Sequence, residues 1–262
     1  MINMKCIYCD RNISSREKSR EHVVPQWILK YLNAEKEKIN LVPISESLFV
    51  HKARSPTTNT LTHTICSKCN NEWLSEIDRS CMPLVKYLAT EIVITRSQII
   101  EKFQIEDIDK LKILIYKIFL NLFATSPFRD KKKKFYNEFY RTKSVPPGTN
   151  LFVSHIIESH ERKIALSHLD GWNDNELPSS DEKMDTPNIR FKFFIQIGKI
   201  AFVMYNTGIN IKPVGIDPRF LSPLHTSVPY IFCNIGLEPP FPPVGDSISN
   251  RLLYSLKTNF SE

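Results

Sequence analysis

Four of the six cysteines in this 262-residue chain form two pairs with the same spacing. Cys6 and Cys9 are separated by two residues, and so are Cys66 and Cys69. Such a pair sits on a tight turn that gives two thiolate ligands to one metal ion, and two pairs supply the tetrahedral set of sulfurs that zinc prefers. The spacing therefore predicts a structural Zn²⁺ held by all four. The alternative is four small buried apolar side chains, which requires the same spacing to arise twice by chance.

A second group of residues that could accept a proton or bind a metal ion lies between the two cysteine pairs and just after the second pair. Glu21 and His22 occur in the sequence SREHVVPQW, and Asn70 directly follows the last cysteine of the second pair. A neutral histidine can accept a proton near neutral pH, and carboxylate and amide oxygens are ligands that suit Mg²⁺ or Mn²⁺. The pairs are separated by residues 10–65, whereas a simple zinc ribbon has about 15–20 residues there. We therefore expect the long insert to present Glu21 and His22 beside the zinc site.

The order Cys-x-x-Cys, Glu-His-Val-Val-Pro, Cys-x-x-Cys-Asn resembles the HNH endonuclease superfamily, also called the ββα-metal or His-Me finger nucleases, in its four-cysteine zinc-braced subgroup. The resemblance covers roughly the first third of the chain. It implies that His22 is the general base that activates water, and that Glu21 and Asn70 hold a catalytic Mg²⁺ or Mn²⁺. Asn59 and His63 both lie near the place of the middle asparagine of the family motif, and neither is assigned.

The resemblance implies hydrolysis of phosphodiester bonds in DNA, with RNA not excluded, and we favour a role in restriction or phage defence. Two other classes of function stay open. The first is a noncatalytic zinc-binding module that binds nucleic acid or protein. The second is a structural or interaction protein in which the later part of the chain carries the function, with a partner subunit or as a homo-oligomer. Cleavage assays separate the nuclease from both.

The elements that position these residues are predicted from local patterns. Val23 and Val24 indicate an extended segment that ends in a helix with Pro25 in its first turn. Adjacent side chains on an ideal strand point to opposite faces, so Glu21 and His22 reach one phosphate only if the backbone twists or ends there. A helix that starts near Asn70 is expected over residues 73–81, with Pro83 ending or kinking it before a further helical piece through Leu88.

The remaining chain predicts a different kind of domain. Residues 108–123 indicate a helix that is apolar on more than one face, interrupted by Lys112, Lys117 and Asn121. Residues 189–204 alternate around a Gly198-Lys199 turn and predict a hairpin, and residues 151–157 and 163–168 suggest a second hairpin. The expected fold is α+β: a small zinc-braced ββα-metal, treble-clef-like head in residues 1–88, then a larger α+β domain in residues 89–262 with an antiparallel sheet and a buried helix.

Charge and hydropathy indicate the class of partner and the cellular location of the protein. A formal charge of +7 favours a polyanionic partner such as DNA, and the run at residues 129–134 is read either as phosphate-binding or as a solvated face. The amino terminus lacks the apolar core of a signal peptide, and no segment is apolar enough to span a membrane. We therefore expect a soluble cytoplasmic protein with no membrane partner.

Overall fold

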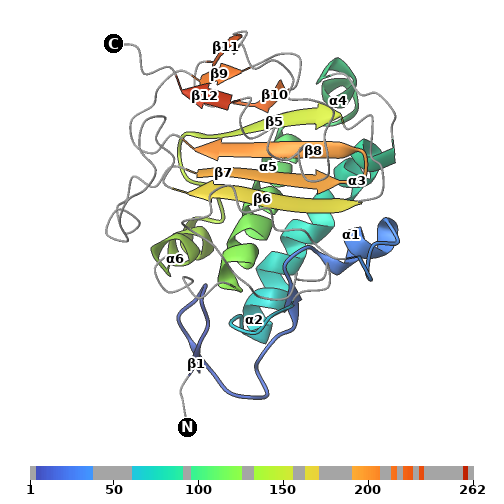
Figure 1. Ribbon diagram of the computed structural model, residues 1–262. Coiled ribbons are helices and arrows are strands. Elements are labelled where there is room, and N and C mark those ends of the chain that lie inside the picture. The colour runs from blue at the N-terminus through green and yellow to red at the C-terminus, as the bar shows by residue number, and fades with distance from the viewer. Residues whose placement is uncertain are drawn as a thin grey trace. The chain divides into compact units, whose positions relative to one another are not determined.

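The structure is a computed structural model that combines helices with antiparallel strands, so the predicted α+β class with an antiparallel sheet is confirmed (Figure 1). Two compact units divide the chain: the first contains residues 1–37, 57–88 and 103–146, and the second contains residues 38–56, 89–102 and 147–262. The sequence places one boundary after residue 88, whereas residues 103–146 group with the first unit. The structure describes residues 4–37, 61–90, 96–125, 133–155, 163–170, 191–206, 214–216, 221–226, 230–232 and 256–258.

Short strands of the first unit carry the first cysteine pair and the Glu21-His22 segment. β1 (Met4–Lys5) and β2 (Asn12–Ile13) form an antiparallel hairpin around Cys6 and Cys9. β3 (Glu21–His22) pairs antiparallel with β4 (Leu61–Thr62). α1 (Gln26–Tyr31) follows directly after Pro25, so the predicted helix is confirmed, whereas the extended segment is the strand at Glu21–His22 and Val23 and Val24 form a bend.

A continuous helical segment begins at the second cysteine pair. It consists of α2 (Ser67–Cys69), a π-helical turn η1 (Asn70–Leu74) and α3 (Ser75–Thr90). The helical segment therefore starts three residues before Asn70, and α3 continues through Pro83, so the alternative in which Pro83 ends the helix is wrong. Proline in a helix interior costs about 3 kcal/mol, but the Pro83 side chain is exposed while the opposite face buries its neighbours, which offsets that cost. The buried residues of this face are Cys81, Leu84, Val85 and Leu88.

Two further helices complete the first unit. α5 (Ile105–Ala124) confirms the predicted helix, and its residues 114–124 are all buried. α6 (Lys133–Thr142) packs through aromatic side chains: the Phe139 ring lies 5.2 Å from Trp73 and 5.1 Å from Tyr116 of α5. Residues 126–132, which include most of the basic run, lie outside the described residues, and Lys133, also part of the run, forms a 2.7 Å ion pair with Asp10.

The second unit contains a five-stranded antiparallel sheet in the order β10-β5-β8-β7-β6 (Figure 1). The hairpin turning at Gly198, whose φ is 62°, is confirmed. The second predicted hairpin is wrong, because β5 and β6 flank the β7–β8 hairpin on opposite sides instead of pairing with each other. The strands are β5 (Thr149–His155), β6 (Ile164–Asp170), β7 (Phe191–Ile197), β8 (Ile200–Asn206) and β10 (Ser222–His225).

A smaller sheet and one helix are the other described elements of the second unit. β9 pairs parallel with β11 and antiparallel with β12. Within the part of the chain that the structure describes, every helix is too short or too polar to cross a bilayer. The elements are α4 (Arg96–Lys102), β9 (Val214–Ile216), β11 (Tyr230–Phe232) and β12 (Leu256–Thr258).

Candidate functional site

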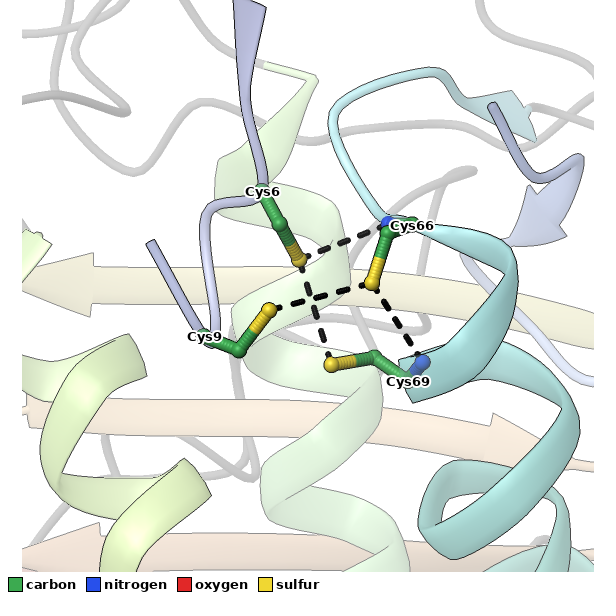
Figure 2. Close-up of side chains that lie close together, drawn as sticks. All are labelled: Cys6, Cys9, Cys66 and Cys69. Atoms are coloured by element: carbon green, nitrogen blue, oxygen red, sulfur yellow. Dashed lines mark hydrogen bonds between the residues drawn. The ribbon is translucent and has the colours of Figure 1, made fainter. Parts of the chain in front are cut away.

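The four predicted cysteines meet in one cluster of the first unit (Figure 2). Their sulfur atoms all lie within 4.8 Å of one another, with Cys6 Sγ 3.9 Å from Cys69 Sγ and Cys9 Sγ 3.7 Å from Cys66 Sγ. Sulfurs bound about 2.3 Å from a tetrahedral zinc are separated by about 3.8 Å. The cluster can therefore hold a metal ion, and its spacing fits the structural zinc that the sequence predicts. Among the described residues it is the one such group of His, Cys, Asp or Glu side chains.

Backbone groups shape each half of this cluster. In the first half, Asp10 closes the turn with a φ of 58°, and its N–H donates to the Cys6 carbonyl at 2.9 Å. In the second half, the Cys66 N–H approaches Cys6 Sγ and the Cys69 N–H approaches Cys66 Sγ, both at 3.4 Å. The side-chain hydrogen bond with Cys69, together with backbone donors that include the Cys66 N–H, lowers the pKa of Cys6 to about 4 against the opposing effect of burial. Such donors favour the thiolate, which is the metal-binding form.

The strand that carries His22 is attached to the second cysteine pair. β3 and the residues before it run antiparallel to β4 and the residues after it, and Lys18 forms an isolated bridge with Cys66. The Ser19 N–H donates to the Ile65 carbonyl at 3.0 Å. This bond continues the backbone pairing from β3, which carries His22, toward the second cysteine pair. The local order is therefore strand, strand, helix, with four residues between the end of β4 at Thr62 and the start of α2 at Ser67.

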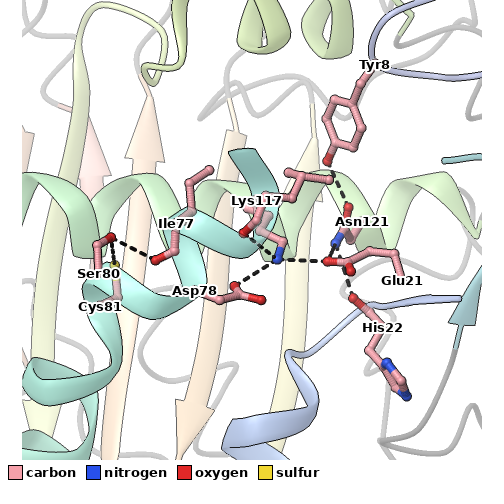
Figure 3. Close-up of polar contacts among 10 residues, drawn as sticks. Tyr8, Glu21, His22, Ile77, Asp78, Ser80, Cys81, Lys117 and Asn121 are labelled. Atoms are coloured by element: carbon pink, nitrogen blue, oxygen red, sulfur yellow. Dashed lines mark hydrogen bonds and ion pairs between the residues drawn. The ribbon is translucent and has the colours of Figure 1, made fainter. Parts of the chain in front are cut away.

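Glu21 points into a buried polar network (Figure 3). Its Oε1 lies 2.8 Å from Nζ of Lys117, and that ammonium group also lies 2.8 Å from Oδ1 of Asp78. Lys117 is fully buried and donates further to the Leu74 carbonyl at 3.4 Å, so all three of its N–H groups have acceptors. Asn121, one turn later on α5, donates from Nδ2 to the same Glu21 oxygen at 3.2 Å.

The opposite charges of this network shift the pKa values of Lys117 and Asp78. Burial alone lowers the pKa of Lys117, but the two carboxylates outweigh it and raise that pKa above its ordinary range. Burial raises the pKa of Asp78 to about 6, the charge of Glu21 adds to this rise, and Lys117 opposes it. One ammonium group therefore holds two carboxylates inside the first unit.

The other predicted site residues occupy different places. The His22 imidazole lies on the other side of β3 from the Glu21 carboxylate and is half-buried (Figure 3). Asn70 is half-buried at the start of η1, and its backbone N–H donates to the Cys66 carbonyl at 3.1 Å. His63 is exposed, and Asn59 lies outside the described residues. The structure thus brings the four cysteines together and separates the Glu21 carboxylate from the His22 ring, as expected for neighbours on a strand.

Sequence reasoning missed the polar partners supplied by α5. Lys117 and Asn121 appear in the sequence only as interruptions of an apolar helix. Their spacing of four residues puts both on one face, and a buried polar side chain requires a partner. The spacing therefore shows that Lys117 and Asn121 need polar partners, but it does not identify Glu21 as such a partner.

The first unit therefore combines a metal-binding cysteine cluster, a half-buried histidine on an adjoining strand and a buried charge network behind that strand. The cluster and the histidine are attached through backbone pairing, and the network contacts the same strand from α5. The chain matches no protein-family model, no curated protein and no solved structure.

Proposed function

We propose that the protein is a metal-dependent endonuclease of the HNH type that hydrolyses phosphodiester bonds of DNA. The carrying observation is the place of His22: it stands half-buried on a strand that pairs with a second strand, and the second strand leads into a helix that begins at the cysteine cluster. A strand, strand, helix order with histidine on the first strand is what the ββα-metal resemblance implies. Restriction or phage defence is the setting that we favour.

In this proposal the four cysteines hold a structural zinc. Zinc has no redox chemistry and accepts four sulfur ligands in a tetrahedron, and the sulfur separations of 3.7 and 3.9 Å suit that arrangement. Because all four coordination positions are filled by protein, this ion stabilises the site and does not activate water.

The chemistry of the proposed reaction needs a base beside the scissile phosphate. The neutral imidazole of His22 takes a proton from a water molecule, the water oxygen bonds to phosphorus, and the bond from phosphorus to the leaving oxygen breaks. A divalent ion, when bound, supplies charge neutralisation at the phosphate. Asn70 stays the predicted amide ligand. Glu21 fits less well, because its Oε1 is already in contact with the ammonium group of Lys117 and the amide of Asn121.

The engagement of Glu21 with Lys117 favours one second candidate, a noncatalytic zinc module that binds nucleic acid or protein. In that case the carboxylate serves folding alone, and the half-buried His22 is a binding residue. This candidate predicts bound zinc and DNA binding without cleavage in any divalent ion.

Cleavage of supercoiled plasmid and of single-stranded DNA, in Mg²⁺ and separately in Mn²⁺, tests the proposal. We expect His22→Ala to lower the nicking rate by about 10²- to 10⁴-fold, the usual contribution of a general base. The control is His225→Ala, which removes a histidine from β10 of the second unit and should leave the rate unchanged. Zinc content is measured for each variant. If nicking persists in zinc-loaded His22→Ala, His22 is not the base. If the wild-type protein does not nick DNA, the noncatalytic zinc module becomes the favoured function.

A further inference from the structure

The side chain of Asn121 connects three separate segments of the first unit (Figure 3). Its Oδ1 accepts from the hydroxyl of Tyr8 at 2.8 Å, and its Nδ2 donates both to Glu21 Oε1 and to the backbone carbonyl of His22 at 3.2 Å. Asn121 has no exposed surface, and neither has Tyr8. Since Tyr8 lies between Cys6 and Cys9, these bonds run from the cysteine cluster to the peptide unit of His22.

Lys117 strengthens the same attachment from the preceding turn of α5. It fixes the Glu21 side chain by an ion pair at 2.8 Å, while Asn121 fixes both that side chain and the backbone of the next residue. Neighbouring side chains of a strand point to opposite faces. Holding Glu21 inward therefore determines that the imidazole of His22 points outward.

We propose that Asn121 is a positioning residue for His22, and that α5, acting through Asn121 and Lys117, anchors the strand on which His22 stands. Glu21 is then the anchor point of this strand and not a ligand of the catalytic ion. The catalytic consequence rests on the proposed nuclease function, whereas the effect on the orientation of His22 does not.

The hydrogen bond from Asn121 affects the position of His22 more than other hydrogen bonds of α5 do, because it ends on the backbone of His22 itself. The part-buried hydrogen bond from Asn121 to the backbone of His22 restricts the strand at the residue whose side chain has to meet the water. Misplacement of a catalytic group by about 1 Å costs on the order of 10²-fold in rate. Loss of a similar hydrogen bond elsewhere on α5 weakens the fold without moving His22.

The chain offers a matched pair of variants that separates these two effects. Tyr8→Phe removes the hydrogen bond to the Asn121 side chain, whereas Tyr136→Phe removes a 2.8 Å hydrogen bond to the Leu120 carbonyl of the same helix. Both tyrosines are fully buried, so the chemical change and the surroundings are alike. Asn121→Leu removes all three bonds with a side chain of nearly the same shape.

The experiment measures the His22 imidazole by long-range ¹H–¹⁵N NMR in the full-length zinc-loaded protein, with the His22→Ala spectrum assigning the signal. We expect the signal to move in Asn121→Leu and Tyr8→Phe and to stay in place in Tyr136→Phe. Nicking kcat should fall on the order of 10- to 100-fold in Asn121→Leu with KM little changed, and less in Tyr8→Phe.

The positioning role is overturned if the imidazole signal stays in place in Tyr8→Phe, or if it moves as much in Tyr136→Phe. When Asn121→Leu does not fold, the two tyrosine variants decide the question. If the wild-type protein nicks no DNA, the nuclease function fails, and the NMR comparison still decides whether α5 orients His22.

Discussion

Replacing Lys117 by methionine should destabilise the first unit more than any surface change. Nζ of Lys117 lies 2.8 Å from carboxylate oxygens of both Glu21 and Asp78, and the side chains of these residues are only 9% and 18% exposed. Methionine nearly fills the volume of the lysine stem, so the loss is mainly that of charge compensation. Removing one partner of a buried ion pair costs about 3–5 kcal/mol. Asp78 adds less than Glu21, because its pKa is already raised to about 6 and it protonates readily.

Urea unfolding followed by circular dichroism, in buffer with excess zinc, measures this loss. At pH 7 we expect Lys117→Met to lower the free energy of unfolding by about 3–5 kcal/mol. The loss should shrink toward pH 5, because Asp78, whose pKa is raised to about 6, takes up a proton and then no longer needs the ammonium group.

The control for this experiment lies on the same helix. Lys112 forms its ion pair with Asp109, whose side chain is 49% exposed and remains solvated when the lysine is replaced. Lys112→Met should therefore cost less than about 1 kcal/mol from this pair. Equal losses for the two variants, or a loss below about 1 kcal/mol for Lys117→Met, would refute the account of the buried network.

Three further outcomes are expected. Cys66→Ser should reduce bound zinc, measured by mass spectrometry of the metal, from one per chain to well below one, while Cys81→Ser, which changes a buried thiol outside the cluster, should retain it. Glu21→Gln keeps an acceptor for Lys117 but loses the ion pair, so it should lower the free energy of unfolding and leave the Mg²⁺ concentration for half-maximal nicking unchanged; a large rise in that concentration would make Glu21 a metal ligand. Asp78→Asn should be at least as stable as the wild-type protein at pH 7. The folded state raises the pKa of Asp78 from 3.8 to about 6, so ionisation of Asp78 destabilises the fold by up to about 3 kcal/mol above pH 6. This advantage of Asp78→Asn should disappear as the pH falls from 6 to 4, and an advantage that grows on acidification would contradict the raised pKa.

Local patterns determined the parts of the site that depend on few residues. The repeated cysteine spacing predicted the cluster because two residues between cysteines are enough to form one half of it. The apolar run at residues 108–123 and the Gly198 turn predicted α5 and the β7–β8 hairpin because helix and hairpin formation depend on nearby positions.

The failures in the second unit and at Pro83 have a common cause. Both β5 and β6 were recognisable as strands, yet their partners are β8 and β7, and the choice among edges depends on how the whole sheet packs. In the same way, proline signals a helix end locally, but the buried face that includes Leu84 and Leu88 favours continuation.

The site shows the same division between local and tertiary information. The sequence by itself determined which residues can bind a metal or accept a proton, because cysteine, histidine and glutamate carry that chemistry wherever they lie. Only the tertiary structure decided that Glu21 faces Lys117 and Asn121 while His22 faces the other way. Asn121 and Glu21 are 100 positions apart in the chain, and a contact of that range is selected by the packing of α5 against β3, not by spacing in the sequence.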